Sequence, residues 1–197
     1  MSLKNIFFEY NFSYKKSNKI ESFQKKKIYR YIKDTKEKIK SKEKLFEIFN
    51  KNFMLNVKIK DLNKYKKFKR IIIIGMGGSI LGSAAVNGLL KEKIKKEVFF
   101  LDNLDPYMIK NISKFKTLKN SLFIIISKSG NTLEVLTIIS NLKSKANFNK
   151  NNSLVITEIK NSKIYSFANK NKIKIINHRQ NVGGRYSIFS ETALIPC

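Results

Sequence analysis

The stretch Ile71–Ser79, IIIIGMGGS, decides the fold of this 197-residue chain. Its four consecutive isoleucines are β-branched and do not alternate with polar residues, so they predict a strand buried on both faces, as in a parallel sheet. The strand opens into a glycine turn, and the apolar residues after it recur at helical spacing. A strand, a glycine turn and a helix in this order can bring backbone N–H groups to a polar or anionic ligand.

The glycine turn does not match the dinucleotide-binding fingerprint G-x-G-x-x-G. That pattern requires glycine at position 80, where the chain has Ile80, and the next glycine, Gly82, comes two residues late. A tight turn between strand and helix, without any ligand, is the structural alternative. The turn alone therefore leaves a binding role and a purely structural role open.

Short apolar strands alternate with helices along the rest of the chain. The pattern predicts strands over 71–74, 98–101, 122–126, 154–156 and 173–176, and helices over 80–92, 131–145 and 162–168. Asp105 and Pro106 predict the N-cap and first turn of a further short helix, and a final helix begins near Ser187. This alternation is typical of an α/β domain with a doubly wound parallel sheet, whose ligands bind beyond the carboxyl ends of the strands.

The first 64 residues are expected to form a lysine-rich, mainly helical amino-terminal extension, and residues 65–197 the ligand-binding domain. Residues 1–17 are predicted as a strand or an arm. Apolar residues between 18 and 50 recur at near-helical spacing, which suits one long helix or two shorter ones. Residues 61–70 are predicted as a polar approach to the central strand.

Lysine dominates the charge of the chain. The 41 lysine and arginine residues outnumber the 14 acidic ones, so the formal net charge is +27, which would attract nucleic acid or anionic lipid. Only four of the basic residues are arginines, and arginine is the residue that forks onto guanine and phosphate. We therefore interpret the lysines as a solvated surface and expect no nucleic-acid partner. Strong, steeply salt-dependent binding would support the nucleic-acid alternative.

The sequence predicts a soluble, cytoplasmic protein with no membrane partner. Cys197 is the only cysteine, so no disulfide can form within this chain, as is usual in a reducing compartment. The first residues lack the apolar core of a secretory signal. No apolar run approaches the roughly 20 residues of a membrane span.

The segment Ser127–Glu134, SKSGNTLE, follows the second buried strand and suits a phosphate monoester. Ser127, Ser129 and Thr132 offer hydroxyl groups, Gly130 allows a close approach, and the next helix begins with free N–H groups. This is not a Walker loop, because G-x-x-x-x-G-K-[ST] does not occur.

The same segment has a structural alternative. Asn131 and Glu134 predict a capping pair, so the segment can also be read as a well-capped helix without a ligand. A charge-assisted bond from Lys128 would contribute roughly 1.5 to 3 kcal/mol to phosphate binding if its side chain pointed into the site.

A third segment, Asn181–Ser187 (NVGGRYS), places Arg185 after two glycines. In a chain that otherwise uses lysine, an arginine indicates a need for a planar fork or a permanent charge. We hypothesise that it stabilises a developing oxyanion, and an ion pair with a carboxylate in a turn is the alternative. His178, the only histidine, is interpreted as a loop residue.

In their order and spacing, GMGGSILG, SKSGNT and VGGRYS resemble the amino-terminal lobe of the glucose-6-phosphate isomerase family, which has the sugar isomerase (SIS) fold. The resemblance covers about residues 71–197 and implies an SIS-type sandwich. It also implies interconversion of glucose 6-phosphate and fructose 6-phosphate, in which a carboxylate base moves a proton through a cis-enediol. It implies no metal, no organic cofactor and a homodimer at full length.

The resemblance assigns roles to residues of each motif. Gly77, Gly78 and Ser79 match the loop that contacts the sugar. Arg185 matches the arginine near the sugar carbons where the enediolate forms. The loop whose hydroxyls and amides hold the sugar phosphate is matched by Ser127, Lys128, Ser129 and Thr132.

The chain also departs from the family pattern. Asn131 stands where many members have threonine, and Glu191 where a small or apolar residue is expected. The family's catalytic glutamate, its histidine and a later lysine lie beyond the arginine motif and have no match, so we expect a truncated piece of a longer isomerase, inactive alone. A non-catalytic SIS module that senses a phosphosugar and a bifunctional phosphoglucose/phosphomannose isomerase are the alternatives.

Overall fold

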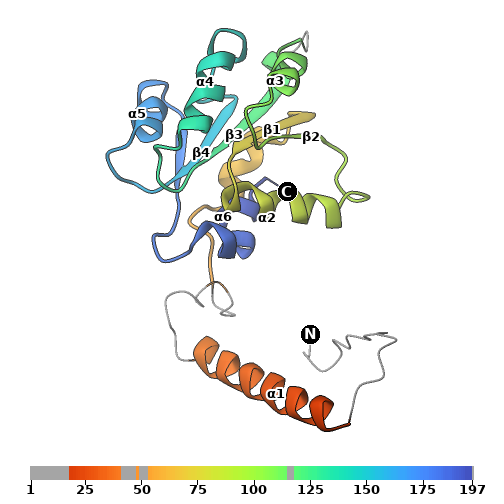
Figure 1. The fold of residues 1–197 in the computed structure, drawn as a ribbon. Helices are drawn as coiled ribbons and strands as arrows, with labels where there is room; N and C mark the ends of the chain where they lie inside the picture. Colours follow the sequence, from red (N-terminus) through yellow and green to blue (C-terminus); the bar gives the residue numbers. More distant parts are fainter. Residues whose placement is uncertain (1–17, 41–47, 49–52, 115–117, 197) are drawn as a thin grey trace. The chain divides into compact units, whose positions relative to one another are not determined.

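The computed structural model describes residues 18–40, 48, 53–114 and 118–196. It divides into two compact units, residues 1–43 and 44–197. The described residues of the first form the helix α1 (Asn18–Lys40), within the region predicted as one long helix or two shorter ones (Figure 1). The strand or arm predicted over residues 1–17 lies outside the described residues.

Five parallel strands form the sheet of the second unit, in the order β2-β1-β3-β4-β5 (Figure 1). Their bounds are β1 (Arg70–Gly75), β2 (Glu97–Leu101), β3 (Ser121–Ile126), β4 (Ser153–Thr157) and β5 (Lys174–Asn177). All five predicted strands are confirmed to within one residue at either end. In β1, β3 and β4 the apolar runs that identify the strands are fully buried, whereas β2 and β5 at the two edges of the sheet are mostly half-buried.

Five helices and three 3-10 helices accompany the sheet in the described part of the second unit. They are α2 (Gly78–Leu89), α3 (Pro106–Ser113), α4 (Leu133–Ala146), α5 (Lys163–Lys170), α6 (Glu191–Leu194), η3 (Ile59–Tyr65), η4 (Leu118–Asn120) and η5 (Gly184–Phe189). The predicted cap of α3 is confirmed, because the Tyr107 N–H donates to Asp105 Oδ1 over 2.8 Å.

Three predicted elements differ from the structure. The helix predicted over 80–92 is α2, which begins at Gly78 because the glycine turn itself forms its first turn, and which ends at Leu89. The polar approach over 61–70 contains most of η3. The final helix predicted near Ser187 is divided into η5 and α6, separated at Ser190 by an extended backbone.

Successive isoleucines of β1 point to opposite faces of the sheet, as the two-residue period of a strand requires. Ile72 and Ile74 belong to an apolar cluster that includes buried residues of α3, α4 and α5. Ile71 and Ile73 belong to a second cluster, which includes buried residues of α2 and η3. The sheet is therefore covered on both faces, and the doubly wound α/β sandwich is confirmed.

The strand order explains why α2 covers a different face from α3, α4 and α5. The connection from β1 to β2 crosses the sheet in one direction, and the later connections cross it in the other. Crossovers of the same hand place their helices on opposite faces when the direction reverses. The reversal lies between β1 and β3, and the carboxyl ends of these two strands are where sheets of this kind bind ligands.

The second unit begins before the boundary expected at residue 65. Ile48 is buried, and the Asn56 N–H donates to Glu191 Oε1 over 2.8 Å. Lys174 Nζ also lies 3.0 Å from Asp61 Oδ2. Asn56 and Asp61 are thus tied to the sheet unit by long-range polar contacts, and the unit begins before residue 65.

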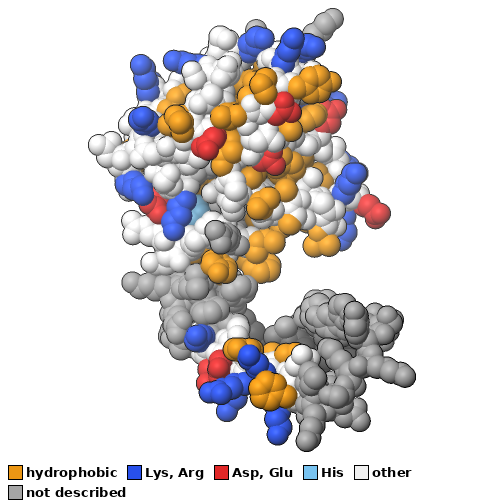
Figure 2. Space-filling model, viewed as in Figure 1, with side chains coloured by type: hydrophobic (Ala, Val, Ile, Leu, Met, Phe, Trp, Pro, Cys, Tyr) orange, Lys and Arg blue, Asp and Glu red, His pale blue; other side chains and the backbone are white. Residues whose placement is uncertain are grey.

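Basic side chains are spread around the face of the sheet unit that Figure 2 shows. On the face shown in Figure 2, lysines and arginines lie around the rim of the sheet unit, while hydrophobic side chains occupy its middle. This distribution agrees with the interpretation of the lysines as a solvated surface, and the absence of a nucleic-acid partner stays a prediction. Within the described part of the chain, no helix is both long and apolar enough to cross a membrane.

The core predicts that replacing two helical leucines by alanine has very different effects on the free energy of unfolding. Leu142 in α4 is fully buried, whereas Leu89 at the end of α2 is 84% exposed. We expect Leu142→Ala to lower the free energy of unfolding by about 2 to 5 kcal/mol, because it leaves a cavity between α4 and the sheet. Leu89→Ala should change it by less than about 0.5 kcal/mol. Urea unfolding followed by circular dichroism measures both, and equal losses would contradict the described packing.

Candidate functional site

Three segments meet beyond the carboxyl ends of the strands: the glycine turn after β1, the loop after β3, and the segment that follows β5. A Cβ built on Gly184 would lie 3.3 Å from the carbonyl carbon of Gly78 and 3.4 Å from the nitrogen of Ser79, so the start of η5 touches the first turn of α2. Lys128 Nζ, in the loop after β3, donates to the Gln180 carbonyl over 2.7 Å. The structure therefore brings together the three segments that the sequence singled out.

The glycine turn adopts a conformation that suits glycine. Gly77 has φ +54°, in the left-handed region, and it is the N-cap of α2. The Ile80 N–H donates to the Gly77 carbonyl over 3.1 Å, which tightens the first turn. Gly77 is exposed and Gly78 and Ser79 are half-buried, so the backbone of this turn is open to a ligand.

The loop after β3 (residues 127–132, the hydroxyl loop) brings together the hydroxyl groups of Ser127, Ser129 and Thr132. Thr132 Oγ1 lies 2.8 Å from Ser127 Oγ and 3.5 Å from Ser129 Oγ. Ser127 is 1% exposed, and its Oγ also accepts the Gly130 N–H over 3.2 Å. Thr132 is the N-cap of the 14-residue helix α4 but makes no side-chain capping bond. Hydroxyl groups and a helix N-terminus thus occur together, as anion binding requires.

The predicted capping pair of Asn131 and Glu134 is wrong. The N-cap of α4 is the next residue, Thr132, and Asn131 Oδ1 instead accepts the Lys163 N–H of α5 over 3.0 Å. Residue 163 is 32 positions away, so only the folded arrangement brings this donor to Asn131. Asn131 therefore joins the hydroxyl loop to the beginning of α5.

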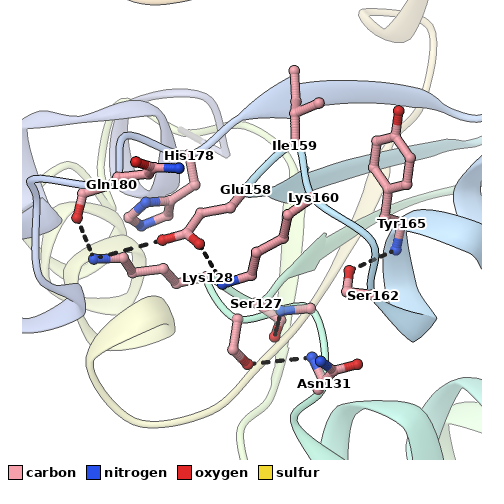
Figure 3. A network of polar contacts seen from close by, with 12 residues as sticks. Ser127, Lys128, Asn131, Glu158, Ile159, Lys160, Ser162, Tyr165, His178 and Gln180 are labelled. Carbon is pink, nitrogen blue, oxygen red and sulfur yellow. Dashed lines mark hydrogen bonds and ion pairs between the residues drawn. The ribbon is translucent and has the colours of Figure 1, made fainter.

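Glu158, which the sequence motifs do not single out, lies directly after β4 and is buried. Its carboxylate pairs with Lys128 over 3.8 Å and also with Lys160. Figure 3 shows Glu158 between the two ammonium groups, with Lys128 reaching on to Gln180. An acidic residue at the carboxyl end of a buried strand was the signal that could have identified it, by the same rule that selected the other loops.

His178 follows β5 and lies in a loop, as interpreted, but it is only 1% exposed. Its backbone N–H donates to the Thr157 carbonyl over 2.9 Å, and its ring nitrogen Nδ1 lies 3.0 Å from the Arg179 carbonyl oxygen. Burial lowers the pKa of His178, although the hydrogen bond to the Arg179 carbonyl opposes this shift. The imidazole is therefore kept neutral in the folded protein near pH 7.

Arg185 is the second residue of η5, next to Gly184, and its side chain lies outside what the structure describes. Glu191, where a small or apolar residue was expected, is 1% exposed. Its Oε1 accepts the Asn56 N–H over 2.8 Å and lies 3.7 Å from Arg179 Nε, so the buried charge has partners from two distant segments. Over residues 18–40, 48, 53–114 and 118–196, no group of three or more His, Cys, Asp or Glu side chains is placed to hold a metal ion.

The fold and the meeting of the three loops define an α/β domain of the sugar isomerase type. A solved structure, glucose-6-phosphate isomerase from Chlamydia trachomatis, shares the fold with a TM-score of 0.57 and 25% identity, over 66% of this chain and 26% of that one. The sequence profile of phosphoglucose isomerase matches residues 24–196. The chain belongs to the phosphoglucose isomerase family.

Two relatives agree with this assignment. The glucose-6-phosphate isomerase of Methanocaldococcus jannaschii is 37% identical over 142 residues, which are 69% of this chain and 35% of that protein. A probable glucose-6-phosphate isomerase of Methanococcus maripaludis is 31% identical over 191 residues, which are 91% of this chain and 42% of that protein. The chain therefore spans less than half the length of either relative.

The hydroxyl loop predicts a large effect of substitution at Gly130. This glycine has φ +69°, and an added Cβ would lie only 2.1 Å from the Oγ of Ser162, which accepts the Tyr165 N–H at the start of α5. We expect Gly130→Ala to lower the free energy of unfolding by about 2 to 4 kcal/mol, through backbone strain and loss of this cap.

Gly88→Ala is the matched control for this change. Gly88 lies in α2, and an added Cβ would meet nothing within 4 Å. Alanine there should leave the protein as stable or raise its stability by up to about 1 kcal/mol. Urea unfolding compares the two variants, and an equal response would contradict the described turn.

The buried imidazole predicts a pH dependence of stability. Because the folded state lowers the pKa of His178, the unfolded state binds more protons once the pH falls below the ordinary value of about 6.5. The free energy of unfolding should therefore fall between pH 7 and 5, by up to about 1.4 kcal/mol per pH unit. His178→Gln should flatten this slope, because the chain has no other histidine. Urea unfolding of the unmodified chain and of His178→Gln between pH 5 and 7 measures this slope. Parallel plots of the free energy of unfolding against pH would contradict the prediction.

Proposed function

We propose that this chain forms the sugar-phosphate-binding lobe of an aldose–ketose isomerase that interconverts glucose 6-phosphate and fructose 6-phosphate. The observation that supports this most is the meeting of the three loops beyond β1, β3 and β5 in a member of the phosphoglucose isomerase family. These loops supply hydroxyl groups, exposed glycine backbone and an arginine at one edge of the sheet. This is the chemistry that a phosphorylated sugar requires.

The phosphate is held in this proposal by Ser127, Ser129 and Thr132 together with backbone amides of the same loop, including that of Lys128. The hydroxyls of Ser127 and Ser129 each hydrogen-bond Thr132 Oγ1. A phosphate monoester has several acceptor oxygens, so it can replace these mutual bonds with bonds to itself. The N-terminus of α4 adds a favourable dipole for the negative charge.

The sugar lies against Gly77, Gly78 and Ser79 in this arrangement, and Arg185 acts on its reacting carbons. The contact of Gly184 with Gly78 and Ser79 brings the residue before Arg185 to the glycine turn. A permanent positive charge next to C1 and C2 stabilises the enediolate oxygen as a base moves the proton between these carbons. In this role Arg185 lowers the free-energy barrier of the proton transfer and has little effect on the dissociation constant of the sugar phosphate.

The proton-transferring base is proposed to come from outside this chain. Glu158 and Glu191 are the buried carboxylates of the described residues, and both have cationic partners. Both side chains are enclosed by protein groups, with 7% of Glu158 and 1% of Glu191 exposed, so neither carboxylate is open to a substrate carbon. Neither is therefore assigned the proton transfer.

Substitutions should separate binding from turnover in the protein that contains this chain. Ser127→Ala combined with Thr132→Ala should raise KM for fructose 6-phosphate about 10- to 150-fold with little change in kcat, since roughly 1.5 to 3 kcal/mol of phosphate binding is lost. Arg185→Ala should lower kcat about 100- to 1000-fold with a much smaller change in KM. Steady-state kinetics in both reaction directions provide the measurement.

Two control variants keep the comparison specific. Thr137→Ala removes a hydroxyl from α4 that donates to the Leu133 carbonyl, and Arg70→Ala removes an arginine paired with Glu97 at the start of β1. Neither should change KM or kcat by more than about twofold. Intact turnover in Arg185→Ala would refute its assigned role. Binding of both sugar phosphates without any interconversion would favour the non-catalytic sensing module.

A further inference from the structure

Lys128 is held by protein groups from two segments, one after β5 and one after β4. Its Nζ donates to the Gln180 carbonyl over 2.7 Å and to the Val182 carbonyl over 3.1 Å, in the segment after β5. It also lies 3.8 Å from Glu158 Oε1, after β4. Figure 3 shows the side chain extended towards Gln180 and passing close to Glu158, away from Asn131 and the hydroxyl loop.

These contacts use most of the hydrogen-bonding capacity of the ammonium group. A lysine ammonium has three N–H donors, and here two carbonyl oxygens accept hydrogen bonds from it while a carboxylate oxygen lies at ion-pair distance. A phosphate bound by this ammonium would compete with those oxygens. Two of them are backbone carbonyls of a segment that lies outside strands and helices, where each carbonyl still needs a partner.

The segment that Lys128 holds leads directly to Arg185. Val182 is fully buried, and after it come Gly183 and Gly184, the latter in contact with the glycine turn. Before Gln180, the backbone N–H of His178 donates to the carbonyl of Thr157, the last residue of β4, and so holds the segment to that strand. Lys128 is therefore the contact that ties the middle of this segment to the loop after β3.

We propose that the side chain of Lys128 has a positioning role: its ammonium fixes the segment of Gln180 and Val182 and so places Arg185, and it is the backbone amide of Lys128, not the ammonium, that contacts the substrate phosphate. This inference rests on the role proposed for Arg185. It assigns the loop after β3 two functions: its hydroxyls face the ligand, and its lysine side chain holds the neighbouring segment in place.

Lys160 provides a matched control, because it pairs with the same carboxylate without sharing the segment contacts. Its Nζ bonds Glu158 Oε2, whereas Lys128 lies near Oε1. Removing either lysine leaves Glu158 with one cationic partner, so neither change leaves a buried charge unpaired. The variants Lys128→Met and Lys160→Met thus differ mainly in the two carbonyl bonds.

The test compares hydrogen–deuterium exchange, kinetics and phosphate inhibition in these variants of the protein that contains this chain. Lys128→Met should raise backbone exchange over residues 179–187 at least tenfold and lower kcat about 10- to 100-fold. KM and the inhibition constant of inorganic phosphate should stay within about threefold. Lys128→Arg should restore most of the exchange protection and kcat, since a guanidinium can also donate to two carbonyls. Lys160→Met should leave all four quantities near their original values.

Each contrary result overturns the inference in a recognisable way. A tenfold rise in the inhibition constant of phosphate with unchanged exchange would make the ammonium of Lys128 a phosphate ligand. Faster exchange with unchanged kcat would show that the order of this segment does not control the position of Arg185. If Lys128→Met does not fold, Lys128→Gln, which keeps one donor group on a shorter side chain, carries the same expectations. Failure of the unmodified protein to interconvert the sugar phosphates would refute the proposed function alone, since the exchange and phosphate measurements still report on the segment.

Discussion

The pairing of β1 with β3 is the constraint on which the rest of the structure depends. The two strands run parallel in the middle of the sheet, and Gly75 at the end of β1 lies opposite Ile126 at the end of β3. A Cβ on Gly75 would lie 3.1 Å from the Ile126 carbonyl oxygen, so glycine is what lets these ends approach. The loops that follow therefore begin about 4.8 Å apart, before they diverge to α2 and α4 on opposite faces.

Long-range polar contacts hold the remaining parts of the site. Segments without regular structure leave carbonyl and N–H groups that need partners, and at this edge many partners come from distant residues. Lys128 bonds carbonyls of residues 52 and 54 positions later, and Glu191 accepts an N–H from a residue 135 positions earlier. The partners of Glu158 and Glu191 offset the cost of burying these two polar side chains inside the domain.

Asp105 and Asn131 illustrate where sequence reasoning succeeds and where it does not. Asp105 caps the helix that follows it, because its acceptor and the Tyr107 N–H are only two residues apart. Asn131 was expected to act in the same way, yet the start of α5 offers it a better placed N–H. The choice between two acceptable donors depends on which one the fold brings close, and no local pattern contains that information.

The sequence by itself determined the five strands, the glycine turn, the hydroxyl-rich loop and the α/β class, because these depend on side-chain periodicity and on backbone preferences within a few residues. Only the tertiary structure decided the strand order, the contact between Gly184 and the glycine turn, the burial of His178 and the direction of the Lys128 side chain. These features join residues far apart in the chain. Their free energy comes from packing and hydrogen bonds that exist only after the strands have assembled.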